Sequence, residues 1–218
     1  RPNRVALFGY AHVPWMKKHQ TMIDERALPD AAARFAQAQA AALMLREAGY
    51  VAIGIDHFAL PEDGLSMALQ AGKMRRNFQG YTVDEADALI GLGASAIGRL
   101  PQGHVQNMPA TGEYQRRVKA GDLATVRGHA MSDDDRAREA VIEKLMCEFG
   151  FGKGWLCLRH GDAALPLFDI ANRMVAEGEY LHKSGDRYEI IEAMRPFARQ
   201  VAARFDAYLE TGAARHSM

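Results

Sequence analysis

The first half of the chain alternates short, continuous apolar runs with a long Ala-rich segment. Residues 5–8 and 50–55 are apolar at successive positions, which is typical of strands buried on both faces. Between them, Asp30 is suited to cap an Ala-rich helix that we expect to continue to Ala48, where Gly49 ends it. This strand–helix–strand succession predicts an α/β fold, in which the residues that follow each strand gather around ligands.

The pattern changes near Thr111, and helical spacing dominates afterwards. Ser132 has a carboxylate three residues later, which indicates a helix start of the capping-box type. Apolar residues then recur at i, i+3, i+4 and i+7 over residues 142–149 and again over residues 167–174. We expect Gly178 to end the second of these helices.

A hairpin and one more helix complete the predicted elements. Residues 179–191 indicate a hairpin, and residues 197–208 indicate a closing helix. Helix, helix, hairpin and closing helix together resemble a small winged-helix-like domain. We therefore expect two domains, residues 1–112 and residues 113–218.

Three stretches show neither a continuous apolar run nor helical spacing of apolar residues, and they are predicted to be loops. Residues 15–29 are polar and mixed, and the prolines that bound residues 101–109 favour a loop there. Residues 76–82 are dense in aromatic, amide and glycine residues, which are poor core material. Buried amides need a partner for every proton and oxygen, and a ligand is one natural supplier of those partners.

Composition places the chain among ordinary globular proteins. It has 218 residues, of which 48% are hydrophobic and 25% charged, enough to bury a core. Its formal net charge is zero, which argues against a general nucleic-acid binder. It has no apolar run long enough to span a bilayer, and no signal peptide is evident.

Cys147 and Cys157 are too few for a disulfide framework, and their spacing fits neither a zinc site nor an iron–sulfur loop. Both lie in apolar surroundings, so we expect two buried free thiols in a reduced, cytoplasmic protein. The histidines do not cluster at metal-ligand spacing either. No metal site is expected in this chain.

Four motifs together resemble a known family. They are residues 10–14 (YAHVP), 54–59 (GIDHFA), 76–82 (RNFQGYT) and 91–97 (GLGASAI). The pattern resembles the oxygen-independent coproporphyrinogen III oxidases, which are radical S-adenosylmethionine (SAM) enzymes of haem synthesis. It covers only the C-terminal half of such an enzyme, and the cysteine motif that holds the cluster is absent here.

The resemblance implies a fold and an activity. The fold would be the late strands and helices of a partial radical-SAM (β/α) barrel, followed by the winged-helix-like domain. The activity would be oxidative decarboxylation of coproporphyrinogen III to protoporphyrinogen IX. A 4Fe–4S cluster, held in the missing N-terminal half, would cleave SAM to a radical that abstracts hydrogen from a propionate side chain. Since the chain opens on Arg1, we interpret it as a segment of a longer protein and expect the isolated segment to be inactive.

Matching positions imply four SAM contacts, namely Ala11, Phe78, Gln79 and Ile97. Taken without the resemblance, Ala11 would be a site of tight packing, Gln79 a turn cap and Ile97 a core residue. The aromatic face of Phe78 is suited to stacking on a purine or a tetrapyrrole edge.

Two further residues are expected to contact the substrate. His57 follows Asp56 and is interpreted as a general acid or a propionate partner, while a hydrogen-bonded structural histidine stays open. Arg76 would bind a propionate, although Arg75 and Arg76 together also fit a solvated face. His104 stands where the family stretch normally begins with Tyr, so no role is carried over for it.

Other functions stay open. The related haem-chaperone branch lacks the combined DHFA and RNFQGYT segments, which favours the oxidase, and a stand-alone porphyrin-binding module without catalysis is the third reading. A DNA-binding winged helix would need several basic residues on its recognition helix, where residues 165–177 offer only Arg173. We expect a monomer that binds coproporphyrinogen III.

Overall fold

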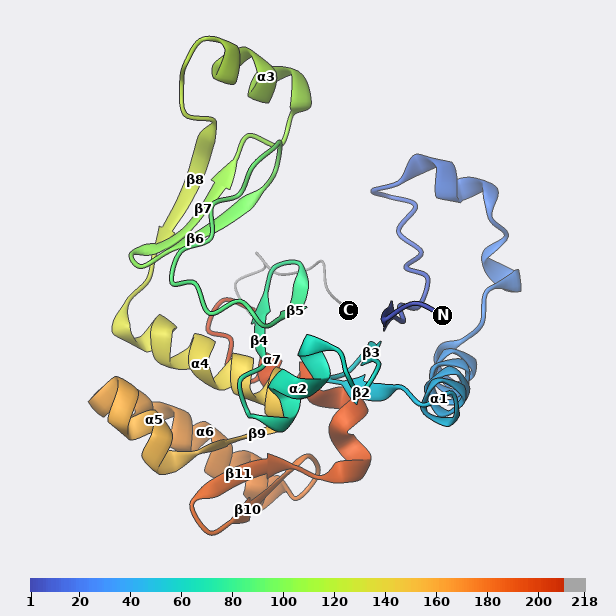
Figure 1. The fold of residues 1–218 in the computed structure, drawn as a ribbon, viewed down its shortest axis with the longest axis vertical. Helices are drawn as coiled ribbons and strands as arrows, with labels where there is room; N and C mark the ends of the chain where they lie inside the picture. The colour runs from blue at the N-terminus through green and yellow to red at the C-terminus, as the bar shows by residue number, and fades with distance from the viewer. Residues whose placement is uncertain (210–218) are drawn as a thin grey trace. The chain divides into compact units, whose positions relative to one another are not determined.

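The computed structural model describes residues 1–209, and its backbone contacts divide the chain into two compact units, Arg1–Met74 and Arg75–Met218 (Figure 1). Both units mix helices with small sheets. The domain boundary that we predicted at residue 112 differs from this division by contacts and stays a prediction. No helix within residues 1–209 is long and apolar enough to cross a membrane.

The first unit contains a three-stranded sheet and two α-helices. Its elements are β1 (Arg4–Ala6), α1 (Ala31–Glu47), β2 (Val51–Ile53), β3 (His57–Ala59) and α2 (Gly64–Gln70), with 3₁₀ helices at Lys18–Met22 and Glu25–Ala27. The strand order is β1-β3-β2, and β3 pairs antiparallel with both neighbours.

The predicted Ala-rich helix is confirmed, together with both of its caps. The Asp30 carboxylate accepts a hydrogen bond from the Ala33 N–H at 2.8 Å, and Gly49 has a positive φ of 84°. The prediction of complete burial for residues 5–8 is wrong, since Phe8 is 65% exposed. The strand β1 lies at the edge of its sheet and therefore lacks a neighbour on one side.

The second unit begins with two small sheets. Its first elements are β4 (Arg75–Asn77), β5 (Gly80–Thr82), β6 (Ile97–Leu100), β7 (Gly103–Asn107), α3 (Thr111–Lys119) and β8 (Thr125–Ala130). The strands β4 and β5 form a hairpin, and β7 is the central strand between β6 and β8.

The predicted loop over residues 101–109 is wrong, because most of it is the strand β7. At Gly103, an added Cβ would collide with the carbonyl oxygen of His129 on the neighbouring strand. Glycine at this position therefore permits close strand pairing instead of marking a loop.

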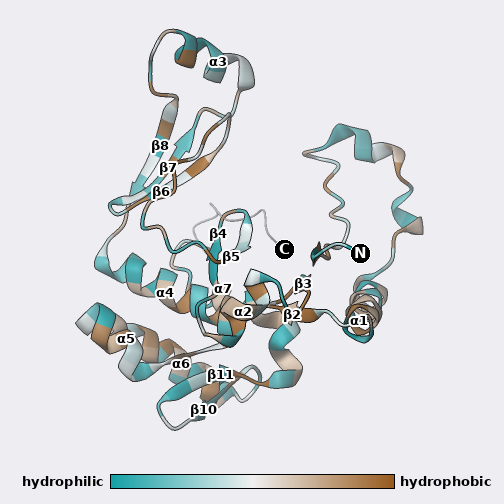
Figure 2. Ribbon diagram, viewed as in Figure 1, coloured by the Kyte–Doolittle hydropathy of each residue, from teal (hydrophilic) through white to brown (hydrophobic). Residues whose placement is uncertain are grey.

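The rest of the second unit is mostly helical. Its elements are α4 (Asp133–Glu148), β9 (Gly150–Gly152), α5 (Lys153–His160), α6 (Leu165–Glu177), β10 (Leu181–Ser184), β11 (Arg187–Ile190) and α7 (Ala198–Ala203), with 3₁₀ helices at Gly161–Ala164 and Glu192–Phe197. Hydrophobic and hydrophilic residues mix along α4, α5 and α6, as expected for amphipathic helices (Figure 2).

Aromatic side chains form the centre of this helical part. Phe151 on β9 stacks on Tyr188 at 5.2 Å between ring centroids and meets Phe205 edge-on at 5.9 Å. All three are almost fully buried. The predicted helix caps and the hairpin over residues 179–191 are confirmed, with Ser132 in a complete capping box and Gly178 in the left-handed region.

The structure thus contains the predicted hairpin and a closing helix. The winged-helix-like arrangement of these elements stays a prediction. The closing helix is shorter than predicted: α7 ends at Ala203 and follows the 3₁₀ turn that contains Pro196. Proline lacks an N–H, which suits it to such a short turn at a helix start.

Candidate functional site

The residues at the tip of the hairpin β4–β5 are Phe78 and Gln79, which sequence reasoning had placed in a loop. The Gln79 N–H donates a hydrogen bond to Oδ1 of Asn77 at 2.9 Å, and Gly80 has a φ of 138° that favours glycine. Phe78 is 55% exposed. The turn is therefore held by the Asn77 side chain, and the side chains of Phe78 and Gln79 are exposed.

The base of this hairpin is fixed to α4 by one carboxylate. Oε1 of Glu143 accepts hydrogen bonds from Nε of Arg75 at 2.9 Å and from the Arg76 N–H at 3.1 Å. The Tyr81 hydroxyl donates to the carbonyl of Met146, also on α4, at 3.0 Å. The turn thus extends from a rigid base.

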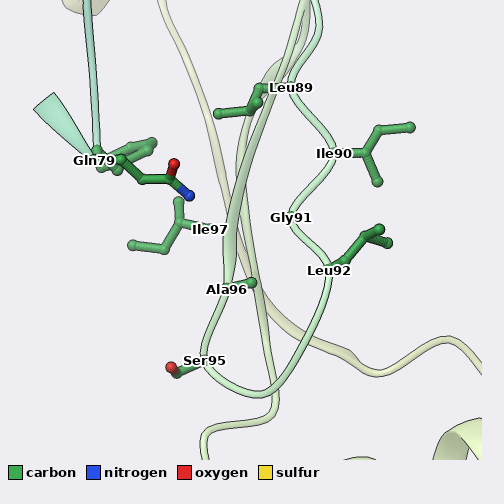
Figure 3. A pocket seen from close by; sticks show the side chains of 9 residues that line it. Gln79, Leu89, Ile90, Gly91, Leu92, Ser95, Ala96 and Ile97 are labelled. Carbon is green, nitrogen blue, oxygen red and sulfur yellow. The ribbon is translucent and has the colours of Figure 1, made fainter. Parts of the chain in front are cut away.

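A pocket of about 270 Å³ lies between the turn and the start of β6. Figure 3 shows the Gln79 amide directed toward Ile97, with Leu89 beside them. Its lining residues are Phe78, Gln79, Leu89, Ile90, Gly91, Leu92, Ser95, Ala96 and Ile97. The structure thus brings together three of the four predicted SAM contacts, Phe78, Gln79 and Ile97, and their role in binding stays a prediction.

Residues 89–93 run closely along β6. A Cβ on Gly98 would lie 2.8 Å from the carbonyl oxygen of Leu89, and one on Gly91 would lie 2.9 Å from the backbone of Ile97. The Asn107 amide donates to the carbonyls of Gly91 and Gly93 at 2.9 and 3.1 Å. Glycine at positions 91 and 98 therefore permits this close approach between two segments of the protein's own backbone.

The adjacent arginines at the hairpin base have different surroundings. Arg75 pairs with Glu143, whereas the Arg76 guanidinium lies over the Tyr81 ring, 4.7 Å from its centroid. Nη1 of Arg76 is buried and has no hydrogen-bond partner within residues 1–209. A buried guanidinium nitrogen without a partner is costly, and a ligand carboxylate would satisfy it.

His104 is a neighbour of the turn that sequence reasoning missed. Its ring meets Phe78 edge-on at 5.2 Å between centroids, its Nε2 lies 3.6 Å from the Glu139 carboxylate, and its buried Nδ1 has no hydrogen-bond partner among the described residues. The signal in the sequence was the histidine in place of the family's usual tyrosine.

Ala11 lies in the first unit and is not among the residues that line the pocket. Its carbonyl accepts a hydrogen bond from the Gln20 side chain at 3.1 Å, and the same side chain accepts from the Val13 N–H at 2.6 Å. Gln20 is 8% exposed. The buried amide therefore fixes the YAHVP segment, and contact between Ala11 and SAM stays a prediction.

His57 is held by its neighbour in the sequence. Its Nδ1 lies 2.7 Å from the Asp56 carboxylate, and its ring meets Phe8 edge-on at 5.7 Å. Both His57 and Asp56 are mostly buried. This geometry fits a structural histidine and also an oriented acid, so the substrate role stays a prediction.

The two cysteines differ more than expected. Cys147 is 1% exposed, and burial together with Glu143 raises the pKa of its thiol to about 12. Cys157 is only half-buried, so its predicted burial is wrong. Within residues 1–209, no group of three or more His, Cys, Asp or Glu residues could hold a metal. The described residues therefore do not fit the implied iron–sulfur cluster.

Comparison with known proteins shows that the chain is similar to one class of enzymes. Its relatives are named oxygen-independent coproporphyrinogen III oxidases. One from Bradyrhizobium diazoefficiens is 48% identical over 219 residues, covering 99% of this chain and 48% of the relative. Another, from Paracoccus denitrificans, is 46% identical over 217 residues, covering 99% and 48%. The chain thus spans about half the length of the curated relatives it matches.

The fold agrees with the sequence relationship. The solved coproporphyrinogen III oxidase from Escherichia coli, described as a radical SAM enzyme, has a TM-score of 0.87 and 30% identity. The match covers 96% of this chain and 49% of that one. No protein-family model matches the sequence. The chain is therefore related to the oxygen-independent coproporphyrinogen III oxidases, which confirms the predicted resemblance to their C-terminal half.

Proposed function

We propose that this chain is the C-terminal part of an enzyme that decarboxylates coproporphyrinogen III oxidatively to protoporphyrinogen IX in haem biosynthesis. The observation that carries the proposal is the 48% identity to a named oxidase across 99% of the chain. The named relatives also favour the oxidase over the haem-chaperone and porphyrin-module alternatives. We expect the enzyme to be cytoplasmic and monomeric.

The turn pocket is the proposed place for part of SAM, which supplies radical chemistry when bound. Phe78 would offer its exposed ring as a stacking face, and Ile97 an apolar wall. The Gln79 side-chain amide has no hydrogen-bond partner within residues 1–209, so it is free to bind a polar ligand group. Ala11 would be the fourth contact. Cluster ligands are expected outside this chain.

The substrate would be held by charge. Arg76 would bind a propionate through its guanidinium, whose Nη1 has no hydrogen-bond partner within residues 1–209, and His57 would serve as a second propionate partner or as an acid. This chain's part in the reaction is then to bind and orient the reactants and to exclude water from them. For the fold, we propose that residues 1–112 are part of a (β/α) barrel and that residues 113–218 form a winged-helix-like domain.

The test is an anaerobic assay of the complete enzyme that contains this chain. It is supplied with coproporphyrinogen III, SAM and a chemical reductant. We expect protoporphyrinogen IX with release of carbon dioxide. SAM cleavage without any loss of carboxylate from the porphyrinogen would contradict the proposal and favour the chaperone alternative.

A further inference from the structure

The sheet β6–β7–β8 presents a row of side chains beside the turn pocket. Its register pairs Ile97 with Gln106, and Gln106 with Arg127 on the next strand. Residues directly paired across antiparallel strands project from the same face of a sheet. Because Ile97 lines the pocket, Gln106 and Arg127 project from the pocket-bearing face.

The adjacent row confirms that the turn covers this face. Arg99 pairs with His104 on β7, and His104 pairs with His129 on β8. The Phe78 ring at the tip of the turn packs against His104. The pocket and both rows therefore share one side of the sheet.

The two arginines on this face differ in their charge partners. Arg99 lies 4.0 Å from the Glu139 carboxylate and donates to the Ala86 carbonyl at 3.4 Å. Arg127 is exposed and has neither a hydrogen bond nor an ion pair within residues 1–209. The row that starts at the pocket wall thus ends in an unpaired guanidinium, two strand spacings or about 10 Å from Ile97.

Gln106 lies between the pocket wall and that guanidinium. Its Nε2 donates to the Ser95 carbonyl at 3.3 Å, which leaves its second amide proton for a ligand. A guanidinium fork matches both oxygens of a carboxylate, and a neighbouring amide adds a further donor.

We propose that Arg127, assisted by Gln106, binds a carboxylate of the ligand seated in the turn pocket. The inference rests on the proposed function, which offers two sources of that group: the methionine carboxylate of SAM and a propionate of the porphyrinogen. Either one must extend about 10 Å from Ile97 along the sheet.

The experiment uses the complete enzyme with Arg127→Gln, Arg127→Lys and Arg187→Gln. Arg187 is a matched control, because it is also an exposed strand arginine and pairs with Glu189 on β11. Michaelis constants for SAM and for coproporphyrinogen III, kcat and the thermal midpoint are measured for each variant.

We expect Arg127→Gln to raise one of the two Michaelis constants by about tenfold, which is the loss of one charge-assisted contact. The constant that rises identifies the source of the carboxylate. Arg127→Lys should give a smaller rise, because it keeps the charge without the fork. The thermal midpoint should stay at the wild-type value, since Arg127 has no partner within residues 1–209 to lose.

Two other outcomes separate the two hypotheses. If the wild-type enzyme converts the porphyrinogen but Arg127→Gln behaves like Arg187→Gln, Arg127 is only a solvated charge and this inference is wrong. If the wild-type enzyme leaves the porphyrinogen unchanged, the proposed function fails and this inference fails with it.

Discussion

At the scale of single residues, Gln79 is the sharpest case, because its backbone and its side chain have separate tasks. The backbone closes the turn through Asn77, while the side chain faces the pocket (Figure 3). In the complete enzyme, Gln79→Ala should therefore lower turnover by about tenfold or more and leave the thermal midpoint nearly unchanged.

The measurement compares protoporphyrinogen formation with thermal unfolding of the unliganded protein. Gln102→Ala is the matched control, because Gln102 is also an exposed turn glutamine, at the β6–β7 connection. A drop of several degrees in the midpoint with activity retained would show that Gln79 is structural.

Substitutions at Arg76 and Arg75 should distinguish an effect on substrate binding from an effect on stability, which the sequence alone could not do. Arg76→Gln is expected to raise the Michaelis constant for coproporphyrinogen III roughly tenfold, because a substrate carboxylate would lose its guanidinium partner. Uncoupled SAM cleavage should be largely retained.

Arg75→Gln should instead lower stability, since it leaves Glu143 with one donor fewer. Steady-state kinetics and thermal unfolding of both variants distinguish these roles. Equal, small effects from the two substitutions would mean that both arginines belong to a solvated face.

At the scale of elements, the stability that the start of α4 contributes to the fold should depend on pH. Burial raises the pKa of Asp135, but hydrogen bonds from Ser132 and Tyr208 outweigh it and lower that pKa to about 2. A carboxyl group with a depressed folded pKa stabilises the fold above its ordinary pKa of 3.8 and loses that contribution as the pH falls toward 2.

Asp135→Asn should thus lower the thermal midpoint at pH 6, and the difference from wild type should shrink as the pH falls from 3.8 toward 2. Ser132→Ala should cost about 1 kcal/mol of stability at pH 6, because it removes the N-cap. Thermal unfolding followed by circular dichroism across this pH range measures both. A difference between Asp135→Asn and wild type that stayed constant with pH would contradict the assignment.

Helices were predicted more accurately than strands, for a physical reason. The caps of α1, α4 and α6 are local signals that lie within a few residues of each helix end. The strand β7 is defined by partners on β6 and β8, and its polar residues and Gly103 gave no local sign of that pairing. Strand pairing is a tertiary property, which a single sequence indicates poorly.

The candidate site shows the same difference between local sequence signals and tertiary contacts. Phe78, Gln79 and Ile97 could be singled out because their motifs resemble a family, and the structure gathers them around one pocket, while their role in binding stays a prediction. His104 could not be, since its contact with Phe78 joins two sheets that are separate in the sequence. The burial of Cys157 was misjudged because an apolar neighbourhood in sequence does not fix which helix face lies inside.

At the scale of the whole molecule, the cysteines limit what the chain can do by itself. Two cysteines, of which Cys147 has a pKa of about 12, cannot supply the thiolate set of a 4Fe–4S cluster. The purified 218-residue chain should therefore bind no cluster after anaerobic reconstitution with iron and sulfide.

Visible absorbance and iron analysis check this expectation. The double variant Cys147→Ala/Cys157→Ala provides the baseline for adventitious iron. An iron-dependent absorbance in the wild-type chain that disappears in the double variant would contradict it.

The attachment of the hairpin base to Glu143 has a consequence for the timing of local opening. The Arg76 backbone N–H donates a hydrogen bond to the Glu143 carboxylate on α4. The Gln79 backbone N–H donates only to the Asn77 side chain, two residues away. Amide hydrogen exchange should therefore be slow at Arg76, where opening requires separation from α4, and fast at Gln79. Exchange measured by NMR would show a turn that fluctuates while its base stays closed, so a ligand could enter under Phe78 without any unfolding of the strands below.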